Sequence, residues 1–191
     1  MSDSKHPRRL IAVIGDGYLD SEDDRDKIER AVALGESLVD AGYRVACGGM
    51  GGVMRAVCRG ARASENYREG DTVGIVPTAD RSDANEFVDI VLPTDLRHAR
   101  NSVVAQCDAL VALGGGAGTL SEMCFGWIYD RLIVAFRVDG WSGRLADRRV
   151  DDRIRFPDIE DDRIVGADSA EEAVEVLRER LPQYLAADSA G

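Results

Sequence analysis

The sequence predicts an α/β fold in which helices cover both faces of a parallel sheet. Two observations support this class. Strand and helix signals alternate from residue 10 to about residue 136, which is the pattern of parallel sheets with helical crossovers. The first apolar run, Leu10 to Gly15, is short, continuous and closed by glycine, as expected of a strand buried on both faces. We therefore expect a Rossmann-like fold of three layers.

The elements of the first half follow one another without long gaps. A helix is expected from about Asp24, because apolar or small residues recur at helical spacing from Ile28 to Val39 and Gly42 supplies a stop. The next helix carries small residues on one face, which would let it lie close to the sheet. The other elements expected here are a strand at 43–49, this second helix at 50–63, a strand at 71–77, a polar connection at 80–86 and an apolar strand at 87–93.

The second half continues the alternation and then loses it. The expected elements are a helix at 95–107, a strand at 108–116, a helix at 118–131 and a strand at 132–138. Residues 139–162 are rich in Asp, Arg and Gly without a sustained period, so we expect a surface loop or a small hairpin. A strand at 163–167 and a helix at 169–181 follow, and a capping box of Ser169 and Glu172 opens this helix.

Length and charge limit the number of domains and the partners. A chain of 191 residues is expected to form one domain, 1–191, with its core at about 10–138, the loop at 139–162 and a last strand and helix at 163–181. Its 24 Lys and Arg against 35 Asp and Glu give a net charge of −11, which argues against nucleic acid as a partner. The acidic, lysine-poor surface suits a high-salt, halophilic cytoplasm, and the base composition of the genome would produce the same bias.

Apolar segments and cysteines bear on the compartment. No apolar run approaches the ~18 residues of a membrane span and no signal-peptide core follows the N-terminus, so we expect a cytoplasmic protein without a membrane partner. The cysteines, Cys47, Cys58, Cys107 and Cys124, lack the CxxC spacing of zinc and redox sites. We expect them to be reduced and buried, and we expect no metal site and no required cofactor.

Three expected strands end in glycine-rich turns, at 15–17, 48–52 and 114–118. The carboxyl ends of parallel strands share one edge of the sheet, where ligands and helix N-termini meet. Glycine lets a phosphate approach the backbone without a Cβ in the way, whereas tight turns and close helix packing are the alternative explanation. The candidate ligand-binding glycines are Gly15, Gly17, Gly48, Gly49, Gly51, Gly52, Gly115, Gly116 and Gly118.

The first of these turns is an incomplete dinucleotide fingerprint. Gly15 and Gly17 fit the first two glycines of GxGxxG, but Asp20 occupies the third position. No Lys-Ser or Lys-Thr pair completes a P-loop anywhere in the chain. Ordinary NAD chemistry and ATP hydrolysis are therefore disfavoured.

Arg100 lies on the apolar stripe of the helix expected at 95–107. The stripe consists of Leu96, Ala99, Val103 and Cys107. A snorkelling side chain or a structural ion pair would explain an arginine there. Alternatively, the stripe meets the ligand edge near the start of the helix, and the guanidinium holds a phosphate or carboxylate through two hydrogen bonds.

Thr119 and Glu122 allow two interpretations. The T-x-x-E spacing forms a capping box for the helix after the last glycine turn, and capping alone would account for both residues. The same placement puts the Glu122 carboxylate at the mouth of a phosphate-binding turn. A ribose hydroxyl or a reacting sugar carbon would lie there.

These motifs resemble those of a known family. The segment GGGAGTLSE, Gly114 to Glu122, is similar to the PGGxGTxxE motif of the LOG (Lonely Guy) or lysine-decarboxylase-like family. The segment GGMGGVM, Gly48 to Met54, resembles its upstream GGGxxGLM loop, and Arg100 aligns with the arginine of its Arg-Lys pair. The match runs from about Leu10 to Val138. Enzymes of this family cleave the N-glycosidic bond of a cytokinin nucleotide, so the resemblance implies a catalytic pair of Arg100 and Glu122 and a phosphate cradle of Gly115, Gly116, Gly118 and Thr119.

Three positions depart from the enzyme motif. Asn101 replaces the lysine after the arginine, Ser121 replaces a glutamate and Gly114 replaces the proline. The combination is more similar to a subgroup that includes molybdenum cofactor carrier proteins, which bind a phosphorylated pterin without converting it. The name lysine decarboxylase carries no weight, because no lysine lies in the motifs.

The sequence thus favours a protein that binds or carries a small phosphorylated, nucleotide-like ligand, with molybdenum cofactor as the named candidate. The alternative is a nucleoside 5′-monophosphate phosphoribohydrolase, with a nucleoside monophosphate as the bound ligand. A third possibility is a protein that uses the pocket only for signalling or assembly. Helices with small or apolar faces, together with the resemblance, favour a homodimer or a larger homo-oligomer.

Overall fold

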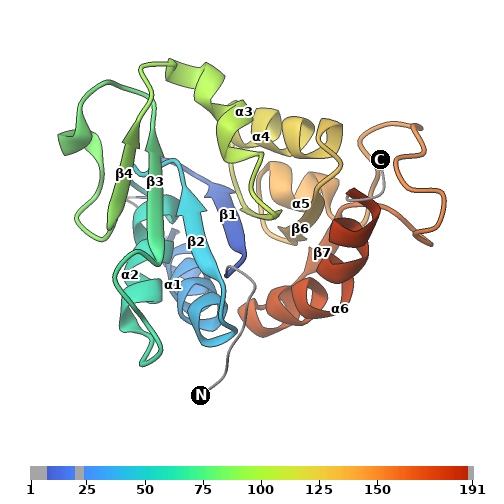
Figure 1. The fold of residues 1–191 in the computed structure, drawn as a ribbon, viewed down its shortest axis with the longest axis horizontal. Helices are drawn as coiled ribbons and strands as arrows, with labels where there is room; N and C mark the ends of the chain where they lie inside the picture. The colour runs from blue at the N-terminus through green and yellow to red at the C-terminus, as the bar shows by residue number, and fades with distance from the viewer. Residues whose placement is uncertain (1–7, 20–23, 189–191) are drawn as a thin grey trace.

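A computed structural model describes residues 8–19 and 24–188 of the chain (Figure 1). In this part, seven parallel strands form one sheet in the order β4-β3-β2-β1-β5-β6-β7. The strands are β1 Leu10–Gly15, β2 Arg44–Cys47, β3 Thr72–Val76, β4 Ile90–Pro93, β5 Ala109–Leu113, β6 Leu132–Phe136 and β7 Val165–Ala167. The fold is the Rossmann-like α/β architecture that the sequence predicts.

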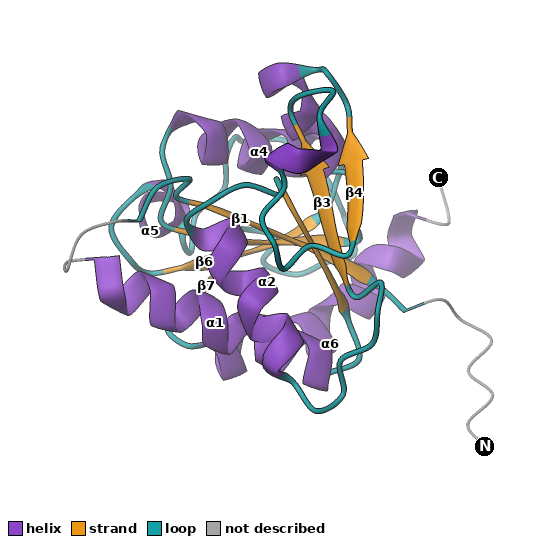
Figure 2. Cartoon of the chain, turned by 90° about the vertical axis from the view of Figure 1, so that its left-hand side faces the viewer, coloured by secondary structure: helices purple, strands orange, loops and turns teal. Residues whose placement is uncertain are grey.

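Helices cover both faces of this sheet (Figure 2). They are α1 Arg25–Asp40, α2 Val53–Ala63, α3 Asn101–Val104, α4 Ala117–Ile128, α5 Trp141–Leu145 and α6 Ala170–Asp188, with short 3-10 helices at Arg81–Asp83 and Arg97–Arg100. Alternate residues of β1 serve the two faces: Ile11 and Val13 pack with α1, α2 and α6, whereas Ala12 and Ile14 pack with α3 to α5. Within the described residues, no helix has the length and apolar character needed to cross a membrane.

Small residues bring α2 against α1, and the helix also packs on the sheet as expected, with Cys58 against Cys47 of β2. A Cβ on Gly35 would lie 2.0 Å from the carbonyl oxygen of Val57, and one on Gly60 would lie 1.9 Å from that of Val32. These glycines allow the two helix backbones to touch. The helix also begins at Val53 and not at residue 50, because Gly49 and Gly52 adopt positive φ angles of 76° and 58° that an α-helix excludes.

The helix predicted at 95–107 is wrong. The structure has a 3-10 turn at Arg97–Arg100 followed by the single α-helical turn α3. Asp95 and Arg97 have φ angles of 52° and 50°, so the backbone is left-handed where the helix should begin. Leu96, assigned to the buried stripe, is half exposed, whereas Arg100 is buried as expected.

The C-terminal third is more regular than predicted. The loop expected at 139–162 contains α5, and Trp141 at the start of this helix packs against the core. Helix α6 continues past Pro182 to Asp188, seven residues beyond the predicted end at 181. The Ser169 hydroxyl accepts a hydrogen bond from the Glu172 amide at 3.2 Å, as in the predicted capping box.

The strand order places a crevice at the carboxyl end of β1. The chain moves outward from β1 to β4 and then crosses back to β5, which lies beside β1 on its other side. Gly15 pairs with Leu113, so the turns that follow β1 and β5 start next to each other. Open α/β sheets bind ligands at such a reversal of strand order.

Candidate ligand-binding site

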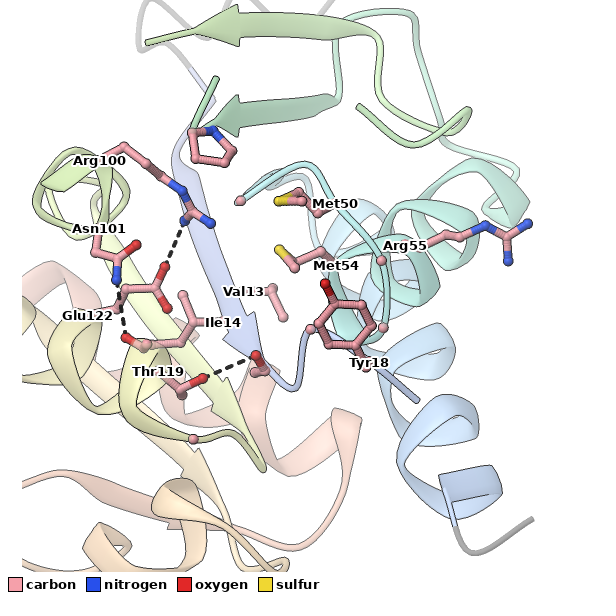
Figure 3. A pocket seen from close by; sticks show the side chains of 18 of the residues that line it. Val13, Ile14, Tyr18, Met50, Met54, Arg55, Arg100, Asn101, Thr119 and Glu122 are labelled. Carbon is pink, nitrogen blue, oxygen red and sulfur yellow. Dashed lines mark hydrogen bonds and ion pairs between the residues drawn. The ribbon is translucent and has the colours of Figure 1, made fainter. Parts of the chain in front are cut away.

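A cavity of about 950 Å³ opens at this point of the sheet (Figure 3). Its walls come from the turns after β1 and β2, the start of α2, the segment from Asp95 to Asn101 and the first turns of α4. Most of the predicted ligand residues line it: Gly15, Gly17, Gly48, Gly51, Gly52, Arg100, Gly116, Gly118, Thr119 and Glu122. The structure therefore brings the three glycine turns together with Arg100 and Glu122.

Gly49 and Gly115 are absent from the cavity lining. Both have positive φ angles, 76° and 93°. A Cβ on Gly49 would lie 2.7 Å from the Val76 side chain, and one on Gly115 would lie 2.2 Å from the Thr119 hydroxyl oxygen. These two glycines shape the turns, as the packing explanation predicts for them. Asp20, the third position of the incomplete fingerprint, lies outside the described residues.

Arg100 and Glu122 form a buried ion pair on one wall of the cavity. The Nη1 atom of Arg100 donates to Oε1 of Glu122 at 2.9 Å. The two residues are 8% and 6% exposed. Burial raises the pKa of Glu122 from 4.5 to about 7, and the neighbouring Arg100 opposes that rise without cancelling it. A carboxyl group with this pKa exchanges a proton near neutrality.

The guanidinium of Arg100 is incompletely satisfied. Its Nε atom is buried and has no hydrogen-bond partner in the part of the chain that the structure describes. Buried donors are usually paired, so an unpaired one at a cavity wall is a candidate contact for a ligand.

Gly48 makes room for this arginine. A Cβ at that position would lie 2.4 Å from Nη2 and 2.7 Å from Nη1 of Arg100. The sequence assigns Gly48 to phosphate binding, whereas the structure shows a direct approach of the guanidinium to its backbone. The absence of a side chain in the turn after β2 therefore leaves the space that the Arg100 guanidinium occupies.

The predicted capping box of Thr119 and Glu122 is wrong. Helix α4 begins at Ala117 with Gly116 as its N-cap residue, so Thr119 lies inside the helix. The Thr119 hydroxyl donates to the carbonyl oxygen of Gly15 at 3.1 Å, and Glu122 pairs with Arg100. Thr119 thus joins α4 to β1, and the position of Glu122 is not explained by capping.

The N-terminus of α4 is open towards the cavity. No side chain caps it, and the first turn of a helix leaves backbone N–H groups without intrahelical partners. A Cβ at Gly116 or Gly118 would have no atom of another part of the protein within 4 Å, so space is free beside these amides. The helix dipole adds positive potential at this end.

Asn101 and Ser121, treated as separate departures in the sequence, touch each other. The Asn101 side-chain amide donates to the Ser121 hydroxyl at 2.7 Å, and this hydroxyl donates to the carbonyl oxygen of Gly118 at 2.7 Å. A neutral pair therefore joins α3 to the first turns of α4. No periodicity or motif in the sequence predicts this contact.

Sequence reasoning missed an apolar wall. Tyr18 lies across the cavity from Arg100 and Glu122, and Met50 and Met54 lie between Tyr18 and Arg100 (Figure 3). The remaining apolar lining residues are Val13, Ile14, Leu19, Ile28 and Ala56. Tyr18 follows the first glycine turn, Met50 lies within the second and Met54 comes two residues after it, and these positions were the available signal.

Apart from the predicted Arg100, basic side chains around the cavity were also missed. The lining includes Arg55, Arg59, Arg97, His98 and Arg100, whereas its acidic side chains are Asp95 and Glu122. Arg55 is paired with Glu86. A chain of net charge −11 thus gathers basic groups around this opening.

The cysteines lie away from the cavity lining. Cys47, Cys58 and Cys107 are buried free thiols as predicted, and burial raises the pKa of Cys107 to about 12. Cys124 is only partly buried, because its helix presents that face towards solvent. The sulfurs of Cys47 and Cys58 lie 3.6 Å apart, which their sequence separation does not suggest. Across 8–19 and 24–188, no group of three or more His, Cys, Asp or Glu side chains is arranged to hold a metal ion.

Curated relatives share much of the chain. A cytokinin riboside 5′-monophosphate phosphoribohydrolase of Arabidopsis thaliana is 32% identical over 171 residues, which cover 81% of this chain and 75% of that protein. An uncharacterized protein of Archaeoglobus fulgidus is 40% identical over 114 residues, covering 59% of this chain and 70% of the relative.

Solved structures share the fold of this protein. The molybdenum cofactor binding protein of Rippkaea orientalis superposes with a TM-score of 0.74 and 26% sequence identity, over 91% of this chain and 97% of that protein. The profile of the SLOG cluster4 family matches residues 8–174. The chain belongs to the SLOG cluster4 family, within the LOG-like Rossmann proteins.

Proposed function

We propose that this protein binds a small phosphorylated, nucleotide-like ligand, with the phosphate at the N-terminus of α4. The observation that carries the proposal is the uncapped first turn of that helix, which is open at Gly116 and Gly118 and lines the same cavity as the incompletely satisfied Arg100. Helix N-termini favour anions through free N–H groups and the dipole. The basic residues around the opening give the same preference for an anion.

Carrier or binding activity is the leading form of this proposal. Asn101 and Ser121 form a neutral pair where the enzyme motif has charged residues, so the polar wall of the cavity lacks part of that motif. The structural similarity to a molybdenum cofactor binding protein supports the pterin cofactor as cargo. The volume of about 950 Å³ is at the upper end of small-molecule sites and accommodates a phosphate together with a ring system.

A second candidate is a phosphoribohydrolase, and the Arg100–Glu122 pair favours it. In that reaction water adds a hydroxyl group to the ribose C1′ and a proton to the departing base nitrogen. The Glu122 carboxylate would stabilise positive charge developing at C1′ or orient the water, while Arg100 would hold the sugar or its phosphate. The pKa of Glu122 near 7 supplies a usable carboxylate at neutral pH.

Gly116→Val tests the phosphate position. The Cβ site is empty and φ is −100°, so we expect an intact fold with ligand affinity lowered at least tenfold. Calorimetry with ribose 5-phosphate, alongside thermal unfolding of both proteins, measures the two effects separately. Unchanged affinity in a folded variant would remove the α4 N-terminus as the phosphate site.

Turnover separates the carrier from the enzyme. The wild-type protein is incubated with a panel of nucleoside 5′-monophosphates and free base is assayed, while the purified protein is analysed for bound molybdopterin. We expect no base release. Measurable release would overturn the carrier form and establish the hydrolase, and wild-type protein that binds neither nucleotides nor molybdopterin would overturn both.

We also propose that the protein forms a homo-oligomer and is located in the cytoplasm. Exposed apolar side chains on the edge strand β4 and on α4, namely Ile90, Leu92 and Ile128, are consistent with self-association into a homodimer or larger oligomer. We propose a cytoplasmic location on the sequence composition. Light scattering of the purified protein measures the oligomer directly.

A further inference from the structure

We infer that Tyr18 and Met54 form the subsite that takes the flat heteroaromatic ring of the ligand. This inference rests on the proposed function and assigns the ring to the Tyr18 side of the cavity. The first observation is Tyr18 itself, which is 86% exposed although it lines the cavity. Its ring stacks on no other aromatic or cationic side chain within 8–19 and 24–188.

The backbone around Tyr18 is held in place. Leu19, the next residue, is buried in the core beneath α1 and α2. Asp16 accepts a salt bridge from Lys27 of α1 at 3.0 Å, and its carbonyl oxygen accepts the amide of Val53 at 2.9 Å. The exposed ring is therefore presented by an anchored turn, which lowers the entropy cost of stacking a ligand on it.

Met54 supplies the surface next to this ring. Its sulfur would lie 2.7 Å from a Cβ on Gly48, and its methyl carbon 3.9 Å from a Cβ on Gly17. The side chain therefore spans the space between the first and second glycine turns. Thioethers pack favourably against aromatic rings, and Met50 adds a second one on the same wall (Figure 3).

The two walls of the cavity then divide the ligand between them. In this assignment the phosphate and sugar contact Arg100, Glu122 and the α4 N-terminus, and the ring contacts Tyr18, Met50 and Met54, all of which line the cavity. None of these three side chains carries a formal charge. Stacking on them is tolerant of the ring's hydrogen-bonding edge, so the subsite accepts a purine or a pterin.

Calorimetry with two probes tests this subsite. Ribose 5-phosphate carries the anionic part alone. Formycin 5′-monophosphate adds an adenine-like ring that is joined through carbon and therefore resists N-glycoside cleavage. We expect wild-type protein to bind the formycin nucleotide at least tenfold more tightly than ribose 5-phosphate.

Tyr18→Ala should lower the affinity for the formycin nucleotide about tenfold, the scale of one base–aromatic stack, and change ribose 5-phosphate affinity less than twofold. Tyr18→Phe keeps the ring and should bind like wild type. Ile154→Ala is the matched control, because it removes another exposed apolar side chain that is not part of the cavity.

The outcomes are distinguishable. Equal affinity of wild-type protein for both probes, or unchanged formycin nucleotide binding by Tyr18→Ala, overturns the ring subsite and leaves the phosphate proposal standing. Wild-type protein that binds neither probe at millimolar concentration overturns the ring subsite, and it overturns the proposed function as well if the purified protein also carries no molybdopterin.

Discussion

Two buried arginine–carboxylate pairs in this protein differ in how fully they are satisfied. Arg155 meets Asp162 through both Nε and Nη2, and its Nη1 donates to the carbonyl oxygen of Arg131 at 3.0 Å. The guanidinium lies 3.7 Å from the centre of the Trp127 ring. The Tyr184 hydroxyl donates to Asp162 at 2.7 Å. This pair fixes the segment after α5 against α4 and α6.

The Arg100–Glu122 pair is sparser. One hydrogen bond of 2.9 Å joins the two side chains, and the Nε atom of Arg100 lacks a partner in the described part of the chain. Both pairs are buried, so both incur desolvation. The additional hydrogen bonds of Arg155 and its contact with Trp127 offset the desolvation free energy of that pair. Arg100, in contrast, retains an unpaired Nε donor for a ligand. The difference separates a structural pair from a candidate functional one.

The largest expected effect is on stability, at the structural pair. Arg155→Ala leaves Asp162 buried without its cation, so the free energy of unfolding should fall by about 3–5 kcal/mol. Chemical denaturation measures this loss. Arg153→Ala, in the same segment, removes a half-exposed ion pair with Asp130 and should cost less than about 1 kcal/mol. Equal losses of stability in the two variants would show that the buried Arg155–Asp162 pair contributes no more than a half-exposed ion pair.

The next effect is the pH dependence that Glu122 imposes. Because the folded-state pKa is raised from 4.5 to about 7, the folded protein holds this proton more tightly than the unfolded chain does. Its contribution to stability is complete below pH 4.5 and is lost as pH rises through 7. Between pH 5 and 8 wild type should lose about 2–3 kcal/mol relative to Glu122→Gln, which cannot titrate.

Urea unfolding of both proteins at pH 5 and pH 8 checks this expectation. Comparing each protein with itself across pH removes the contributions of the carboxyl groups that they share. A difference between the proteins that is the same at both pH values would show that Arg100 already holds Glu122 ionised at pH 5.

Some features of the fold and of the candidate site follow from patterns within a single segment of the sequence. The strands were predicted because buried apolar runs such as Leu10 to Gly15 are contiguous, and the meeting of the glycine turns follows from parallel strand topology. Arg100 and Glu122 were singled out from their local pattern. Their contact depends on how the 3-10 turn at Arg97–Arg100 packs against α4. Arg100 is buried as predicted, although the helix predicted at 95–107 is wrong.

The misses are non-local or conformational. Left-handed φ angles at Asp95 and Arg97 are imposed by the turn between β4 and α3, and neither residue is a glycine that would signal them. The Asn101–Ser121 contact and the Tyr18 wall join segments far apart in the chain. Propensity and periodicity describe one segment at a time, so they contain no information about such pairs.

A smaller effect is expected on changing the geometry of the candidate functional pair. Arg100→Lys keeps the positive charge and loses the planar, forked guanidinium. We expect the affinity for ribose 5-phosphate to fall about tenfold while the free energy of unfolding changes by less than about 1 kcal/mol. Titration calorimetry and thermal unfolding report the two quantities. A large loss of stability with normal affinity would show that this pair, like that of Arg155, is structural.

The smallest effect concerns the neutral Asn101–Ser121 pair, which joins α3 to α4. Ser121→Ala removes the acceptor of the Asn101 amide, but that amide retains the carbonyl oxygen of Gly118 at 3.4 Å. We therefore expect a loss of about 0.5–1.5 kcal/mol in stability, typical of one hydrogen bond, and less than a twofold change in ribose 5-phosphate affinity. Ser102→Ala is a matched control, because its exposed hydroxyl donates only to the carbonyl oxygen of Ala99. An affinity loss in Ser121→Ala that Ser102→Ala does not share would place Ser121 among the groups that act on the ligand, and the functional region would then extend beyond Arg100 and Glu122.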